Sequence, residues 1–144
     1  MVVATKGRAG GAGVHSKNAV VRMHASTIEQ CTAVSRRGDA YGGAVYVFDG
    51  GMLIARSRIA DCAVLCLGSE WYSYAFGGGL YLLAAGTDSF KLEDSQILRC
   101  SSTVQSSNGQ VRAGGLLLTH KSRTSVNQNT MAIKRSTIAG CTAT

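Results

Sequence analysis

The chain has 144 residues, including 18 glycines and no proline, with 45% hydrophobic residues and a formal net charge of +7. Its apolar content excludes a disordered chain, the lack of proline excludes collagen, and no apolar run is long enough for a membrane-spanning helix or a signal peptide. Both ends of the chain are basic but no run exceeds two bases, which indicates solvated surface charge and no specific nucleic-acid partner.

The motif Ser-x-Ile-x-x-Cys occurs four times and divides the chain into repeats, with successive copies 31, 38 and 41 residues apart. Residues 1–9 are predicted to be an N-terminal extension, and residues 10–144 a single domain whose repeats span approximately 10–37, 38–76, 77–112 and 113–144. The identical positions form three structural columns: Ser26, Ser57, Ser95 and Ser136; Ile28, Ile59, Ile97 and Ile138; and Cys31, Cys62, Cys100 and Cys141.

Each repeat is predicted to contain three short strands. The first follows a pair of glycines, and either of its alternations, Val45 with Val47 or Ala44 with Tyr46, can face a core. The second strand leads to the motif serine, because apolar residues there alternate with polar or small ones. The third carries the motif isoleucine and cysteine inward, and a loop of variable length follows the cysteine.

Repeated interior positions with variable spacing are typical of an all-β solenoid, a parallel β-helix whose rungs stack at about 4.8 Å. The Gly-Gly-Ala-Val-Tyr, Gly-Gly-Leu-Tyr and Ser-x-Ile-x-x-Cys segments resemble repeats of right-handed parallel β-helix proteins in the pectin-lyase-like superfamily. They are most similar to the GG[AIL] repeats of polymorphic outer-membrane proteins and related surface proteins, although Ile-x-x-Cys replaces the Phe-x-x-Asn of those repeats. The resemblance implies a right-handed helix of about four rungs, as parallel crossovers favour.

The cysteine column has two interpretations. Neighbouring Cα atoms would lie about 5 Å apart, which is within the range of a disulfide, so bridges could form in an oxidising compartment. Alternatively, the reduced thiols pack in the core as small hydrophobic groups. No Cys-x-x-Cys motif is present, and Cys62 and Cys66 have no histidine close in sequence, so neither a metal nor another cofactor is expected.

The loops after the motif cysteines are the expected binding surface, because insertions in solenoids project on one face. The predicted patch combines aromatic rings with charged groups, which suits a glycan or a protein partner. Alternatively, the aromatic side chains cover the side of the solenoid or an oligomer contact. The patch consists of Arg36, Arg37, Asp39, Glu70, Trp71, Tyr72, Tyr74 and Arg112.

We expect a structural or adhesive segment without catalytic activity. No acidic residues pair in one column, and Glu93 and Asp94 align with Lys134 and Arg135 of the next rung as a charge ladder. The alternative, which the resemblance implies, is a polysaccharide lyase or hydrolase module of the same fold. Uncapped strand edges predict end-to-end stacking with further rungs of a longer array. If that array is exported, an extracellular or cell-surface location is expected.

Overall fold

A computed structural model of the protein describes residues 1–5, 8–68, 73–84, 89–105, 108–120 and 131–144. Every regular element in these residues is a β-strand, and every strand pairing is parallel, which confirms the all-β, parallel class expected from the repeats. The described residues include no helix with the length and apolar character needed to cross a membrane.

The strands form five sheets, named A to E in the order in which the chain visits them. Sheet A contains β1 (Val2–Ala4), β6 (Thr32–Ser35), β11 (Ala63–Cys66), β16 (Ser101–Val104) and β21 (Thr142–Ala143). Sheet B contains β2 (Ala9–Gly10), β7 (Ala40–Tyr41), β12 (Tyr74–Phe76) and β17 (Gln110–Arg112). Sheet C contains β3 (Val14–Lys17), β8 (Val45–Phe48), β13 (Leu80–Ala84) and β18 (Leu116–His120). Sheet D contains β4 (Val21–His24), β9 (Met52–Ala55), β14 (Phe90–Glu93) and β19 (Met131–Lys134). Sheet E contains β5 (Thr27–Glu29), β10 (Arg58–Ala60), β15 (Gln96–Leu98) and β20 (Thr137–Ala139).

Each full turn of the chain, from sheet A through sheet E, places one strand in each sheet, so equivalent strands of successive turns pair in register. In sheet E, for example, the motif isoleucines pair as Ile28 with Ile59, Ile59 with Ile97, and Ile97 with Ile138. The prediction of three strands per repeat is therefore wrong, because each repeat contributes five. Residues 2–4, within the expected N-terminal extension, form β1 and pair with β6.

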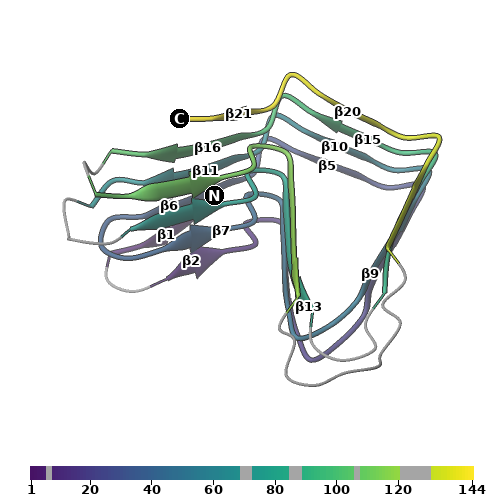
Figure 1. Ribbon diagram of the computed structural model, residues 1–144, viewed down its shortest axis with the longest axis horizontal. Coiled ribbons are helices and arrows are strands. Elements are labelled where there is room, and N and C mark those ends of the chain that lie inside the picture. The colour runs from purple at the N-terminus through teal and green to yellow at the C-terminus, as the bar shows by residue number, and fades with distance from the viewer. Residues whose placement is uncertain (6–7, 69–72, 85–88, 106–107, 121–130) are drawn as a thin grey trace.

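The sheets divide each repeat into a body and an arm, as Figure 1 shows. Sheets C, D and E form the three sides of the body, whose core contains large side chains such as Phe90, Ile59 and Leu82. Sheets A and B form the arm, whose core contains Ala33, Val64 and other small residues. Val45 and Val47 pack inside the body, and Tyr46 joins a separate aromatic cluster, which resolves the alternation that the sequence leaves open.

The arm replaces the variable loops predicted after the motif cysteines. Its two layers are thin because small residues face each other at alternate positions, such as Ala33 in β6 and Ala40 in β7. Alanine and serine give little hydrophobic contrast, so the period-two pattern is weak in the sequence. At the junction with the body the backbones nearly touch, since a Cβ on Gly78 would lie 2.1 Å from the carbonyl oxygen of Ser101. Only glycine fits there.

Sharp bends with positive φ separate the strands of the body. The residue before each motif serine has φ of 47–49°, and the residue before each motif cysteine has φ of 49–64°. These residues are Ala25, Arg56, Asp94 and Arg135 at the serine bend, and Gln30, Asp61, Arg99 and Gly140 at the cysteine bend. The left-handed conformation costs non-glycine residues free energy, so the repeated Ser and Cys side chains must offset that cost.

Candidate functional site

The serine column satisfies backbone groups at the bend between sheets D and E. The Ser57 hydroxyl donates to the Ala55 carbonyl at 2.8 Å and accepts from the Ser26 N–H at 3.2 Å. Likewise, the Ser95 hydroxyl donates to the Glu93 carbonyl at 2.6 Å and accepts from the Ser57 N–H at 3.0 Å. A small side chain with a donor and an acceptor is therefore required at this position, which explains the repeated serine as a structural residue.

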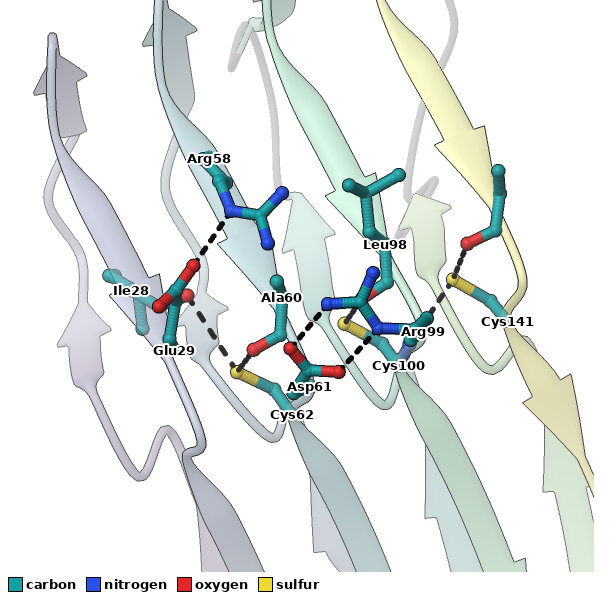
Figure 2. Close-up of polar contacts among 11 residues, drawn as sticks. Ile28, Glu29, Arg58, Ala60, Asp61, Cys62, Leu98, Arg99, Cys100 and Cys141 are labelled. Carbon is teal, nitrogen blue, oxygen red and sulfur yellow. Dashed lines mark hydrogen bonds and ion pairs between the residues drawn. The ribbon is translucent and has the colours of Figure 1, made fainter.

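The cysteine column has an equivalent arrangement at the bend between sheets E and A (Figure 2). The Cys62 thiol donates to the Ala60 carbonyl at 3.1 Å, and the Cys100 N–H donates to Cys141 Sγ at 3.4 Å. All cysteines are free thiols, as the second interpretation of the sequence proposes. A hydrogen bond from Cys100 lowers the pKa of Cys62, and the same bond, with burial, raises the pKa of Cys100.

Ion pairs run beside both bends on the outer surface. Arg99 binds Asp61 in a bidentate pair at 2.6 and 2.7 Å (Figure 2), and Arg135 binds Asp94 in the same way at 2.6 and 2.9 Å. The Asp94–Arg135 pair confirms the cross-repeat charge ladder expected from the sequence. These guanidinium groups hold the pKa values of Asp61 and Asp94 below their ordinary values. Both carboxylates are therefore occupied by structural partners.

The most pronounced concentration of aromatic rings lies between sheets B and C, on the surfaces that face away from the arm and body cores. Tyr41, Tyr46 and Tyr81 form its buried centre, with Phe48 and Phe76 partly buried against them. The rings of Tyr46 and Tyr81 stack with centroids 5.4 Å apart and planes 1° apart. They stack because β8 and β13 are paired in register, with Tyr46 opposite Tyr81. We call this cluster the aromatic angle.

Cations surround the aromatic angle. The Arg8 guanidinium lies 5.9 Å from the Tyr41 ring centroid, Lys17 Nζ lies 5.8 Å from the Phe48 centroid, and the Arg112 guanidinium lies 5.5 Å from the Phe76 centroid. These distances are within the range of cation–π attraction. Arg8 and Lys17 belong to the first turn of the coil, directly before β2 and in β3, and Arg112 comes from β17 of a later turn, so the stacking of repeats adds its charge to this surface.

A shallow pocket of about 230 Å³, largely open to solvent, lies at the N-terminal end of the aromatic angle. His15 stacks on Tyr46 with centroids 5.0 Å apart and forms one wall of the pocket. The complete lining is Arg8, His15, Lys17, Tyr46 and Phe48. Two permanent cations and three rings in one pocket are suited to binding an anion that also has an apolar or ring-shaped face.

The hydroxyls of Tyr41 and Tyr46 are neutral hydrogen-bonding groups. Burial, followed by the Tyr81 phenol, raises the pKa of Tyr46 to about 12. Burial also raises the pKa of Tyr41, and its hydroxyl donates to Asp39 Oδ2 at 2.6 Å. Asp39 additionally accepts an ion pair from Arg8 at 3.3 Å. These groups therefore bind and orient a ligand more readily than they exchange protons with it.

The structure separates the members of the predicted patch. Asp39 and Arg112 belong to the aromatic angle, and the Tyr74 ring lies 5.4 Å from Phe76. Arg36 and Arg37 are exposed in the turn between β6 and β7, at the outer end of the arm (Figure 1). Glu70, Trp71 and Tyr72 lie outside the described residues.

Sequence reasoning missed the central residues of the site, Tyr46 and Tyr81, together with the pocket residues Arg8, His15 and Lys17. One signal was available, because Tyr46 and Tyr81 occupy the same position of their repeats and alternate with inward-facing valines and leucines. No protein-family profile, curated protein or solved structure matches this chain.

Proposed function

We propose that the protein is a segment of a right-handed parallel β-helix that acts as a non-catalytic, adhesive scaffold and binds an acidic glycan in the pocket of the aromatic angle. The stacking of His15 and Tyr46 between Arg8 and Lys17 is the observation that carries this proposal. Sugar rings stack their C–H faces on aromatic rings, and carboxylate or sulfate groups pair with guanidinium and ammonium groups.

The sheet order supports the β-helix assignment. Each sheet takes every fifth strand, so the chain passes through A, B, C, D and E and then returns to A beside its previous strand. Parallel strands joined in this way follow the right-handed crossover rule, which supports the handedness that the sequence resemblance implies. Such a coil presents one long surface along which equivalent side chains recur.

Four of the six described side-chain carboxylates are engaged by neighbouring side chains, which supports a non-catalytic role. Glu29 accepts a bond from Arg58 at 2.7 Å, Asp61 and Asp94 are bound by arginines, and Asp39 is engaged by Tyr41 and Arg8. Glycoside cleavage commonly requires a carboxylic acid with a raised pKa and a second carboxylate close to it. The pKa values of Asp61 and Asp94 are lowered by their arginine partners, so these two groups are poor general acids at neutral pH.

Further repeats are the proposed partners at the two ends. Ile133 and Ile138 in the last repeat are 51% and 42% exposed, whereas the equivalent Ile54 and Ile59 of the second repeat are 2% and 1% exposed. Strands of the same type, stacked on β19 and β20, would bury these side chains and pair the free strand edges.

Binding measurements on the full chain test the glycan proposal. We expect tetragalacturonate or a heparin hexasaccharide to bind more tightly than uncharged cellohexaose, because Arg8 and Lys17 attract anions. Lys17→Gln should weaken binding of the acidic oligosaccharide by about tenfold, the loss of one charge-assisted contact. Lys91→Gln is the matched control, since Lys91 is exposed on sheet D.

Mass spectrometry of the oligosaccharide after incubation separates binding from catalysis. An intact oligosaccharide agrees with the scaffold role. Shortened products would contradict that role and support the lyase or hydrolase alternative. Equal binding of acidic and uncharged oligosaccharides, or no binding of either, would overturn the glycan proposal.

A further inference from the structure

The interior cysteine column is a group of four thiols that the glycan proposal does not use. Cys62 lies opposite Cys100, because the flanking pairs Ile59 with Ile97 and Ala63 with Ser101 are in register. Cys62 and Cys100 are fully buried, and Cys31 and Cys141 are partly exposed at the two ends of the column. The two central thiols are therefore shielded from solvent, and the two end thiols are partly accessible.

Glycines of the bend before sheet C pack closely against three of the four sulfur atoms. A Cβ added to Gly115 would lie 2.9 Å from Cys141 Sγ, and one added to Gly79 would lie 3.1 Å from Cys100 Sγ. A Cβ added to Gly13 would lie 3.4 Å from Cys31 Sγ. Cys31, Cys100 and Cys141 thus face glycine backbone on this side, whereas Cys62 lies in the same core cluster as Ala44.

The spacing of the repeats favours an ion over a disulfide between neighbouring sulfurs. Paired strands hold equivalent atoms about 4.8 Å apart, whereas a disulfide needs Cβ atoms about 3.8 Å apart. Closing that gap would stretch the backbone hydrogen bonds on both sides of the column, such as Ser101 N–H to the Cys62 carbonyl at 2.9 Å. Two bonds of the zinc–thiolate length, about 2.3 Å each, in line span about 4.6 Å, so a two-coordinate ion of similar bond length fits the repeat spacing.

We propose that the cysteine column binds Cu(I), with each ion held linearly between the sulfurs of neighbouring repeats. Soft thiolate ligands select Cu(I), and a two-coordinate ion needs only two of them. Among the described residues no group of three or more His, Cys, Asp and Glu side chains is arranged for a metal ion, so higher coordination has no ligands here.

The binding step balances without electron transfer. Two thiols release two protons, and two Cu–S bonds form to an ion that enters as Cu(I) and remains Cu(I). Four thiols accommodate up to two ions, one between Cys31 and Cys62 and one between Cys100 and Cys141. Each of these pairs includes a partly exposed sulfur, through which copper enters the column.

The serine column indicates that Cys→Ser substitutions in the cysteine column should preserve the fold. A serine placed after a positive-φ residue makes the same hydrogen bonds as the cysteine, but its hard oxygen does not bind Cu(I). Cys62→Ser and Cys100→Ser should therefore preserve the bend and remove ligands. Cys66→Ser is the matched control, because Cys66 lies in the arm core and not in the column.

The test is a titration of the reduced full chain with Cu(I) in the absence of oxygen, in competition with a chromophoric Cu(I) chelator. We expect wild type and Cys66→Ser to hold the same amount of copper, up to two ions per chain, and to show thiolate-to-copper absorption in the ultraviolet. The Cys62→Ser/Cys100→Ser double variant, with strand content confirmed by circular dichroism, should hold copper at least tenfold more weakly.

Equal copper retention by the double variant and wild type would overturn the proposal. So would loss of copper in Cys66→Ser, or failure of the wild type to compete with the chelator. If the double variant loses its strand content, the single variant Cys141→Ser replaces it, since Cys141 lies at the end of the column. It should then lose about half of the bound copper, and full retention would contradict the site.

Discussion

The body and the arm are built from the same repeats but differ in the size of their interior side chains. The body encloses Phe90, Ile59 and Leu82, whereas the arm holds its two sheets together with Ala33, Ala40 and similar residues. Large side chains keep three sheets apart around a core, and small ones allow two sheets to lie close together. Sheets B and C meet at an angle, where the chain turns at positive-φ residues such as Gly42 and Gly77.

Aromatic side chains from both parts gather in that angle. Tyr41 comes from the arm and Tyr46 from the body, and their ring centroids lie 5.2 Å apart. A thicker arm would displace sheet B, and with it Tyr41 and Phe76, relative to the Tyr46 and Tyr81 stack. The stability of the body and the geometry of the arm are therefore expected to respond differently to substitution.

The largest expected effect is a cavity in the body. Phe90→Ala should lower the free energy of unfolding by about 3–5 kcal/mol, because Phe90 is fully buried in the large core. Val64→Ala in the arm removes less apolar volume and should cost about 1–2 kcal/mol. Urea unfolding followed by circular dichroism measures both values. Equal losses would show that body and arm are not distinct in packing.

A pH-dependent loss of stability is expected from the arm. Burial raises the pKa of the Cys66 thiol to about 11 from its ordinary value of 9.0. Below pH 9 both the folded and the unfolded chain keep this proton. Between pH 9 and 11 only the unfolded chain loses it, so the free energy of unfolding falls by about 2–3 kcal/mol and then levels off.

Cys66→Val isolates this contribution, because Val104 occupies the equivalent position in the next repeat. Other thiols and phenols titrate in both proteins, so the difference between the two curves reports Cys66 alone. Parallel curves between pH 9 and 11 would contradict the buried, neutral thiol.

The smallest expected effect compares one serine in the body with one in the arm. Ser57→Ala should cost about 1–3 kcal/mol, since it leaves the Ser26 N–H without its partner, while the Ala55 carbonyl keeps its bond from the Ala25 N–H at 3.0 Å. Ser102→Ala should cost less, because Ser102 only donates to the Ala113 carbonyl, at 3.2 Å. Unfolding midpoints in urea test which variant is less stable. A larger loss of stability in Ser102→Ala than in Ser57→Ala would contradict the structural role of the serine column.

The columns of the body were predictable because identical residues repeat at positions where backbone geometry demands them. Ser57 and Cys62 follow positive-φ residues, and Ile59 between them fills the core. The arm was not predictable, since alanine and serine at alternate positions give no hydrophobic contrast. The aromatic angle escaped notice for a related reason, because Tyr41 and Tyr46 lie on opposite sides of a glycine bend in strands of different sheets.

The central claim is that ligand binds in the angle between body and arm and not at the outer end of the arm. Nuclear magnetic resonance of the ¹⁵N-labelled full chain, titrated with tetragalacturonate, tests it most directly. We expect the largest amide shifts at Arg8, His15, Lys17 and Tyr46, with Arg36 unchanged. Shifts centred on the turn between β6 and β7, or no shift at any residue, would contradict the account.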